Sequence, residues 1–262
     1  MSTIAVTMVK NEQDIVGPII EHMVGQVDHV IVADNMSTDS TRAILNDFGD
    51  SITVIDDLDP AYEQSLKMSR LAQQALLMGA EWVVPFDADE YWYSPHYDTI
   101  SECLSRLSQY RIAEAKLYNH YATDKDVYDD NPLKRIGYRF REPGALPKVA
   151  VRAAGDLVIH MGNHGAEYTD DPSVTPNRVH DQLVVRHFPY RTPEQFIQKV
   201  RQGAEALKKA ELPETAGQHW RNYAQILEQQ GPDAIYAVYY QWFHFDDPDS
   251  NPELIYDPCI TP

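Results

Sequence analysis

Two carboxylates separated by one small residue stand near the middle of the chain, in the segment Asp87-Ala88-Asp89-Glu90. The segment directly follows an apolar run, residues 82–86, that has the composition of a buried strand. Carboxylates at this spacing can reach one hard cation. Mg²⁺ or Mn²⁺ prefers oxygen ligands and keeps positions open for substrate phosphates. A solvated turn would have the same tripeptide, so its meaning depends on the elements around it.

The elements before this segment alternate between strand and helix. Apolar, β-rich runs predict the strands, and apolar residues at helical spacing predict the helices. The expected strands cover residues 3–9, 28–34, 52–55 and 82–86, and the expected helices include residues 15–23, 43–45 and 62–78. Such alternation implies parallel strands with helices on both faces of one sheet. Ligands bind at the carboxyl ends of such strands, where this chain places Lys10-Asn11-Glu12, Asp34-Asn35, Asp56-Asp57 and Asp87-Ala88-Asp89-Glu90.

The pattern after residue 95 is less regular. We expect a helix at 100–110, a strand at 114–118 and a long functional loop at 124–147, where polar residues, proline and glycine are frequent. Short strands follow at 149–152, 157–160 and 183–186, and helices at 194–207, 219–230 and 234–243. The simplest organisation is one α/β domain, residues 1–192, with a helical C-terminal extension, residues 193–262, packed on it.

Composition excludes several classes of function. The chain has 262 residues and a formal net charge of −18, which argues against a broad electrostatic grip on nucleic acid or anionic lipid. No window approaches the ~20 consecutive apolar residues that a membrane span needs. The N-terminus lacks the pattern of a secretory signal, and the two cysteines have no metal-like spacing. We therefore expect a cytoplasmic protein.

Several motifs together resemble one enzyme family. They are Val9-Lys10-Asn11-Glu12, Asp34-Asn35-Met36-Ser37-Thr38-Asp39-Ser40-Thr41, Asp87-Ala88-Asp89-Glu90, Gly162-Asn163-His164, His187-Phe188-Pro189-Tyr190-Arg191 and His219-Trp220-Arg221. The set resembles the GT-A glycosyltransferases, in particular the family 2-like bacterial group with Lys-Asn-Glu and Asp-Ala-Asp-Glu motifs. The resemblance covers roughly residues 3 to 223. It implies a GT-A, Rossmann-like fold: a mostly parallel sheet flanked by helices, with a helical C-terminal extension.

The resemblance also implies roles for residues at the carboxyl edge of the sheet. Asp34 would accept a hydrogen bond from the nucleotide base, although it could equally cap the following helix. The end of the first strand, Thr7 to Val9, would frame the base. Asp87 and Ala88 would lie near the ribose or metal, and Asp89 would bind the metal directly. The family's usual glycine after Asp34-Asn35 is Met36 here, so the residue that most easily adopts a left-handed backbone is absent.

Basic residues and one histidine complete the expected donor site. His187 is the candidate third metal ligand and favours Mn²⁺ over Mg²⁺; a buried histidine bonded to the backbone is the alternative. Arg191 and Lys199 could neutralise the diphosphate, and Arg221 could close over the donor. Arg70 could approach the diphosphate from the helix before the acidic motif, or could simply be a surface residue.

An inverting transfer needs a base that removes the proton of the acceptor hydroxyl. His164 and Glu167 are the favoured candidates, and His160 and Glu90 are the others. A retaining reaction would not need a base at the same place. The sequence alone therefore leaves the stereochemical outcome open.

The predicted activity is metal-dependent transfer of a sugar, of hexosyltransferase type, from a UDP- or GDP-sugar to a hydroxyl. The acceptor could be a glycan, a lipid, a protein or a modified nucleobase, and a homodimer is compatible with the aromatic C-terminal residues. The alternatives are a nucleotidyltransferase or sugar-nucleotide pyrophosphorylase, and a non-catalytic nucleotide- or carbohydrate-binding module. A glycine-rich basic loop after the first strand would favour a pyrophosphorylase, but Lys10-Asn11-Glu12 contains no glycine.

Overall fold

The computed structural model describes the chain except for residues 62, 172, 174–181, 211–216 and 260–262. The chain forms two compact units. The first consists of Met1–Leu58, Gln64–Tyr118 and Glu142–His187, and the second of Asp59–Glu63, Asn119–Arg141 and Phe188–Pro262. The second unit therefore takes in a segment from the middle of the chain as well as the C-terminal helices. The expected functional boundary after residue 192 stays a prediction.

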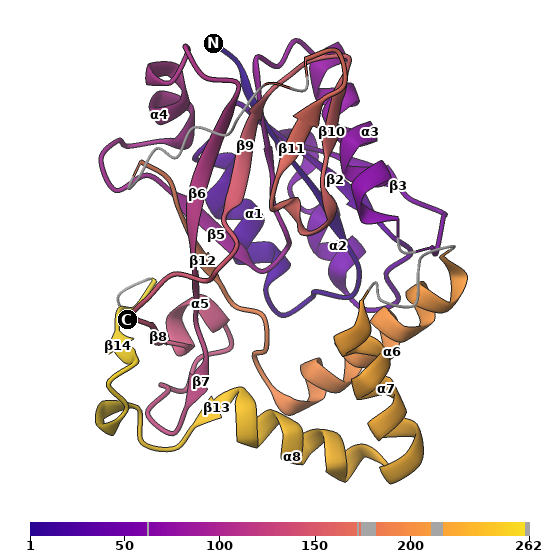
Figure 1. The fold of residues 1–262 in the computed structure, drawn as a ribbon, viewed down its shortest axis with the longest axis vertical. Coiled ribbons are helices and arrows are strands. Elements are labelled where there is room, and N and C mark those ends of the chain that lie inside the picture. The colour runs from indigo at the N-terminus through magenta and orange to yellow at the C-terminus, as the bar shows by residue number, and fades with distance from the viewer. Residues whose placement is uncertain (62, 172, 174–181, 211–216, 260–262) are drawn as a thin grey trace. The chain divides into compact units, whose positions relative to one another are not determined.

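The first unit is built on an eight-stranded sheet with the order β3-β2-β1-β4-β9-β6-β12-β5 (Figure 1). Its strands are β1 (Thr3–Val9), β2 (His29–Asp34), β3 (Ile52–Asp56), β4 (Trp82–Pro85), β5 (Glu90–Tyr93), β6 (Ile112–Asn119), β9 (Lys148–Arg152) and β12 (Val184–His187). The helices in this unit are α1 (Val16–Val24), α2 (Thr41–Asn46), α3 (Gln64–Leu77) and α4 (Ile100–Arg106). The predicted α/β fold, with a large sheet flanked by helices, is confirmed.

The N-terminal half of the sheet is parallel, as the alternation of elements predicts. β1 pairs in parallel with β2 and with β4, and β2 pairs in parallel with β3. Val9, Asp34 and Asp56 share one level of the ladder, because Val9 faces Asp34 and Asp34 faces Asp56. The carboxyl ends of the strands therefore meet at one edge, where ligands bind in open sheets.

The other half of the sheet is antiparallel. β9 runs antiparallel to β4 and β6, and β12 runs antiparallel to β5. Strand β5, which begins at Glu90 within the acidic motif itself, was not predicted from the sequence. The β5–β12 ladder places His187 opposite Glu90. A residue almost a hundred positions later in the chain is thereby brought to the acidic motif.

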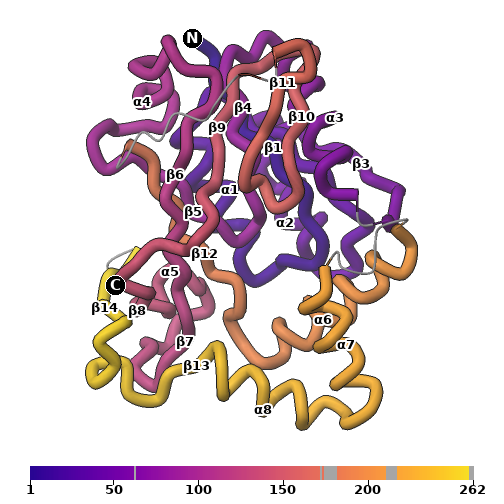
Figure 2. The backbone as a smooth tube through the Cα atoms, viewed as in Figure 1, coloured from indigo at the N-terminus to yellow at the C-terminus, as the bar shows by residue number. Residues whose placement is uncertain are grey.

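Packing on the parallel half explains which side chains are buried. Ile4 and Val6 of β1 lie in one apolar cluster with Met68 and Leu71 of α3 and with the hairpin β10 (Leu157–Ile159) and β11 (Ala166–Tyr168). Figure 2 shows this hairpin beside α3. Successive side chains of a strand alternate between faces, so Ala5 and Thr7 point to the opposite face. Helix α1 contacts β2 and β5 and buries Val16, Ile19 and Ile20.

The second unit contains the three predicted C-terminal helices, α6 (Pro193–Lys209), α7 (Gln218–Gln230) and α8 (Pro232–Trp242). Phe196, Val200, Ile235 and Tyr239 are in its core. The prediction of one continuous loop at 124–147 is wrong, because helix α5 (Pro132–Arg135) and strand β8 (Tyr138–Phe140) interrupt it. β8 pairs with the C-terminal strand β14 (Leu254–Tyr256), and β7 (Ala122–Thr123), just before this region, pairs with β13 (His244–Phe245). No helix among the described residues is both long enough and apolar enough to cross a membrane.

Candidate metal and donor site

The loops that follow β1 and β2 are joined to one another by hydrogen bonds. The Glu12 backbone N–H donates to the Thr41 hydroxyl at 2.8 Å, and Thr41 is fully buried. Further bonds run from backbone N–H groups to side chains of the other loop: Asn11 to Ser37, Thr38 to Asn11, Gln13 to Asp39 and Ser40 to Gln13. Asn11 and Met36 have φ of 54° and 55°, so Met36 adopts the left-handed conformation without being glycine. The hydrogen bonds between the two loops therefore stabilise the backbone conformation of both.

Asp34 takes part in the same local structure. Its Oδ1 accepts a hydrogen bond from the Ser37 backbone N–H at 3.1 Å, and its Oδ2 lies 3.5 Å from the Arg42 guanidinium. The carboxylate is almost fully buried. Asp34 does not cap α2, whose N-cap residue is Ser40. The proposed contact with a nucleotide base stays a prediction.

The acidic motif itself forms a turn between β4 and β5. The Glu90 backbone N–H donates to the Asp87 carbonyl at 3.0 Å, and the Asp87 backbone N–H donates to Glu90 Oε2 at 3.1 Å. The Trp92 indole N–H donates to the same carboxylate oxygen. Glu90 has no exposed surface, and this burial raises the pKa of its carboxyl group, opposed by the nearby Lys148 ammonium. Glu90 therefore braces the turn from the inside.

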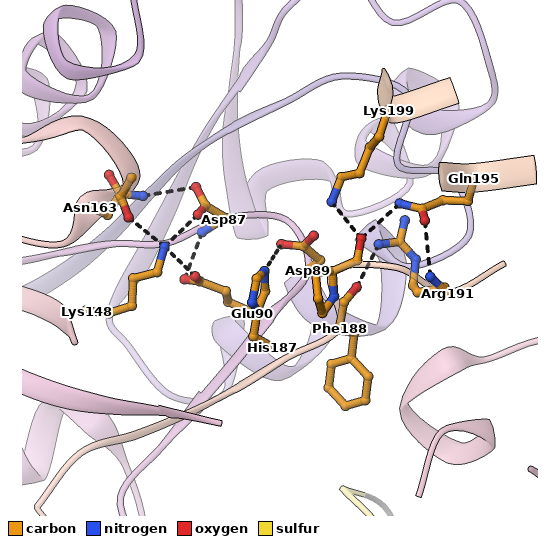
Figure 3. Close-up of polar contacts among 12 residues, drawn as sticks. Asp87, Asp89, Glu90, Lys148, Asn163, His187, Phe188, Arg191, Gln195 and Lys199 are labelled. Atoms are coloured by element: carbon orange, nitrogen blue, oxygen red, sulfur yellow. Dashed lines mark hydrogen bonds and ion pairs between the residues drawn. The ribbon is translucent and has the colours of Figure 1, made fainter. Parts of the chain in front are cut away.

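Lys148, the first residue of β9, is buried and contacts two carboxylates of the acidic motif (Figure 3). Its Nζ lies 2.7 Å from Asp87 Oδ2, 2.6 Å from Glu90 Oε1 and 2.6 Å from the Gly162 carbonyl oxygen. The contacts to Asp87 and Gly162 are hydrogen bonds, and the contact to Glu90 is an ion pair. Burial alone would lower the pKa of Lys148, but the carboxylates of Asp87 and Glu90 outweigh it and raise that pKa. The lysine is therefore charged.

The second oxygen of Asp87 is also engaged. Asp87 Oδ1 accepts hydrogen bonds from the side-chain amides of Asn163 at 3.0 Å and Gln64 at 3.1 Å. Gln64 in turn accepts from the Gly162 backbone N–H. Asn163 has φ of 57° and follows Gly162, whose φ is 75°, so a left-handed turn carries the amide to the carboxylate. Both oxygens of Asp87 are thus bound by protein groups.

Asp89 lies differently. It is almost fully buried, and its Oδ1 is 3.5 Å from Nε2 of His187 (Figure 3). Two atoms bound to one Mn²⁺ at about 2.0–2.2 Å each stand about 3.0–3.5 Å apart. The Asp89–His187 pair therefore fits a divalent metal in spacing and in donor chemistry. The pair is brought together by the β5–β12 ladder.

The predicted trio of Asp87, Asp89 and His187 does not form a close group of three ligand atoms. Within the described ranges, the group of three metal-binding side chains within 4.8 Å of one another is Asp124, His244 and Asp246 in the second unit. There His244 Nε2 lies 2.8 Å from Asp124 Oδ1, and both aspartates are exposed. This group was not predicted from the sequence. Direct metal binding by Asp87 stays a prediction.

The candidate bases differ in their surroundings. His164 Nδ1 is 2.8 Å from the Pro147 carbonyl oxygen, which can only accept, so Nδ1 carries the proton and Nε2 holds the lone pair of the neutral ring. Burial lowers the pKa of His164, and the positive Lys148 lowers it further. Glu167 is exposed and lies 3.9 Å from His160 Nε2. His164 is therefore the candidate held neutral in a fixed orientation.

The remaining predicted residues of the first unit occupy distinct positions. Thr7 and Val9 are buried in β1, and Ala88 is buried within the acidic turn. Arg70 is exposed, whereas α3 buries Lys67 and Leu71 toward the sheet. Lys67 pairs with Asp57 at 2.8 Å. The proposed approach of Arg70 to a diphosphate stays a prediction.

Three predicted basic residues, Arg191, Lys199 and Arg221, belong to the second unit. Arg191 is buried and its guanidinium donates to the Phe188 carbonyl at 3.0 Å, while Lys199 donates to the Pro189 carbonyl at 3.2 Å (Figure 3). Arg221 lies half-buried on α7. The contacts of Arg191 and Lys199 stabilise the segment that precedes α6. The proposed binding of diphosphate by all three basic residues stays a prediction.

The sequence did not predict a role for Lys148 or Gln64, and it marked Asn163 only as part of the motif Gly162-Asn163-His164. The available signal was a lysine at the start of the apolar run Lys148-Val149-Ala150-Val151. Lysine at the end of a strand is ordinarily exposed, so this signal is weak without the positions of Asp87 and Glu90.

No protein-family model matches the chain, and no curated protein matches it. Among solved structures, S. aureus TarS 1–349 matches with 12% identity over 92% of this chain and 72% of that chain, with a TM-score of 0.44. Glucosyl-3-phosphoglycerate synthase from Mycobacterium tuberculosis, in complex with Mn²⁺, UDP and glucosyl-3-phosphoglycerate, matches with 18% identity over 44% of each chain and a TM-score of 0.30. A nucleotidyl transferase from Methanothermobacter thermautotroptrophicus matches with 17% identity over 58% of this chain and 72% of that chain, with a TM-score of 0.33. These are distant likenesses.

Proposed function

We propose that this chain is a metal-dependent glycosyltransferase that moves a sugar from a UDP- or GDP-sugar to a hydroxyl acceptor, as a hexosyltransferase of the GT-A type. The observation that carries the proposal is the pair Asp89–His187, one carboxylate and one imidazole at 3.5 Å beside the carboxyl edge of parallel strands. The motifs after β1, β2 and β4 that resemble the GT-A family add support. A pair of one oxygen and one nitrogen donor favours Mn²⁺ over Mg²⁺.

Asp89 and His187 would hold the metal, which would neutralise the charge that grows on the leaving diphosphate. The chain's own residues would do the rest. Asp34 and the end of β1 would orient the nucleotide, and Glu90 would keep the turn rigid from its buried position. Rigid support of this kind keeps reacting atoms in register.

His164 would act as the base of an inverting reaction. Its Nδ1 donates to the Pro147 carbonyl, which leaves the lone pair on Nε2, and its lowered pKa keeps the ring neutral near pH 7. A neutral, oriented imidazole can accept the proton of an acceptor hydroxyl. Glu167 is the second candidate, although its exposure leaves it without a fixed orientation.

The test is release of nucleoside diphosphate from a panel of UDP- and GDP-sugars, with Mn²⁺ and with chelator. Asp89→Asn should lower kcat/KM at least about a hundredfold, because the metal loses its charged ligand. Asp50→Asn, at an exposed carboxylate in the same unit, is the matched control and should keep native activity. Consumption of added pyrophosphate, with formation of UTP or GTP and a sugar 1-phosphate from the same donors, would instead favour a nucleotidyltransferase. Metal-independent activity, or none with any donor, would overturn the proposal.

A further inference from the structure

Lys148 has no role in the proposed chemistry, yet it is nearly inaccessible and lies at the centre of the acidic motif. Removing an ammonium from water is costly unless charge and hydrogen bonds compensate it. Here two carboxylates and one carbonyl oxygen supply that compensation, at 2.6–2.7 Å from Nζ. These contacts fix the position of Lys148. They also fix the positions of the Asp87 and Glu90 carboxylates that surround it.

The effect of Lys148 on the two aspartates is unequal. Asp87 Oδ2 is bound by the ammonium, and Asp87 Oδ1 is bound by the amides of Asn163 and Gln64. Asp89, one small residue away, instead approaches His187. Although only Ala88 separates the two aspartates, Asp87 pairs with the buried Lys148 and Asp89 lies beside the imidazole of His187.

We propose that Lys148 is a positioning residue for the sugar-transfer site: it holds the Asp87 carboxylate in place and so keeps Asp87 from taking a position on the metal. The position would then remain available to the donor diphosphate. This inference rests on the proposed transferase function, because it presumes that Asp89 and His187 hold a divalent ion. It adds a residue from β9 to a site otherwise made by β4, β5 and β12.

Lys148→Met is the informative variant, because methionine has similar length and no charge. Without the ammonium, Asp87 Oδ2 loses its charged partner and only the neutral amides of Asn163 and Gln64 still hold the side chain, so we expect the carboxylate to turn and bind the metal. We expect Mn²⁺ to bind Lys148→Met about tenfold more tightly than the native protein, while kcat falls about tenfold or more. Lys134→Met, at an exposed lysine on α5, is the matched control and should change neither quantity.

The test is a double-mutant cycle of Lys148→Met and Asp87→Asn, with Mn²⁺ binding measured from the electron paramagnetic resonance signal of free Mn²⁺. In the native background, Asp87→Asn should weaken Mn²⁺ binding by about threefold or less, because Asp87 is not a ligand. In the Lys148→Met background, Asp87→Asn should reverse the gain and weaken binding about tenfold. A role of Lys148 in folding alone would not couple these two substitutions in metal affinity.

The possible results separate the inference from the function on which it rests. Additive effects of the two substitutions would overturn the role of Lys148 and leave the transferase intact. A loss of Mn²⁺ affinity in Asp87→Asn as large as that in Asp89→Asn would also overturn the role of Lys148. This comparison can be made even if Lys148→Met does not fold. If the native protein releases nucleoside diphosphate from a sugar nucleotide but binds no Mn²⁺, the inference is wrong and the metal assignment falls with it.

Discussion

The first unit carries two sets of polar motifs at the carboxyl edge of its parallel strands, and they are built in opposite ways. The loops after β1 and β2 bond to each other through backbone N–H groups and short polar side chains, such as Glu12 with Thr41 and Asn11 with Ser37. The turn after β4 is held by charged and amide side chains from distant elements, such as Lys148 and Asn163. Both sets resemble the same enzyme family in sequence.

The difference shows that a motif can fix the shape of the backbone or can concentrate charge. Hydrogen bonds from backbone N–H groups to side-chain oxygens fix the backbone contour of the two loops. Buried carboxylates and a buried ammonium instead create a strong local field, and they are costly to assemble. Substitutions in the two sets should therefore differ in size and in kind.

The largest effect is expected for Glu90→Leu. This substitution removes the ion-pair partner of Lys148 and the acceptor of the Asp87 backbone N–H and the Trp92 indole N–H, all inside the protein. Breaking a buried charged pair costs about 3–5 kcal/mol, so the free energy of unfolding in urea should fall by about that amount. Glu21→Leu, at an exposed position of α1, should change it by about 0.5 kcal/mol or less. Equal free energies of unfolding for the two variants would contradict a stabilising role of the buried Glu90–Lys148 pair.

The elements of the parallel half could be predicted from the sequence because each strand is a continuous apolar run. β1, for example, has the predicted bounds, residues 3–9. β5 could not be predicted in the same way. It is four residues long and begins with the charged Glu90, so its alternation of buried and half-exposed side chains is too short to read.

The site was only half predictable for a related reason. Asp87, Asp89 and His187 were predicted as site residues because carboxylates and a histidine after apolar strands form a recognisable pattern. The pairing of Asp87 with Lys148 joins residues 61 positions apart. No local rule fixes such a contact, because it depends on β9 inserting antiparallel beside β4. Which partner an individual carboxylate has thus depends on the order of the strands in the sheet. The sequence motif alone does not predict that order.

An intermediate effect is expected for Thr41→Val in the loop set. Valine keeps the shape of threonine but leaves the Glu12 N–H without its acceptor in a buried position. An unsatisfied buried donor costs about 1–3 kcal/mol. Thr38→Val is the matched control, since the Thr38 hydroxyl is exposed and its bond to Asn11 is long at 3.4 Å. Urea unfolding should separate the two variants, and a Thr38→Val cost as large as that of Thr41→Val would show that the loops are not held by this bond.

The smallest effect tests whether backbone shape is what the loop set preserves. Met36 has φ of 55°, where a side chain costs about 1–2 kcal/mol and glycine costs nothing. Both Met36→Gly and Met36→Ala remove the same half-buried side chain, so their difference isolates the backbone. Glycine gives up about 0.5–1 kcal/mol through the freedom of the unfolded chain. We therefore expect Met36→Gly to be more stable than Met36→Ala by about 0.5–1 kcal/mol in urea unfolding, the reverse of the usual order. A more stable alanine variant would mean that this loop relaxes out of the left-handed conformation when its side chain is shortened, so that the β1 and β2 loops would not hold a fixed contour.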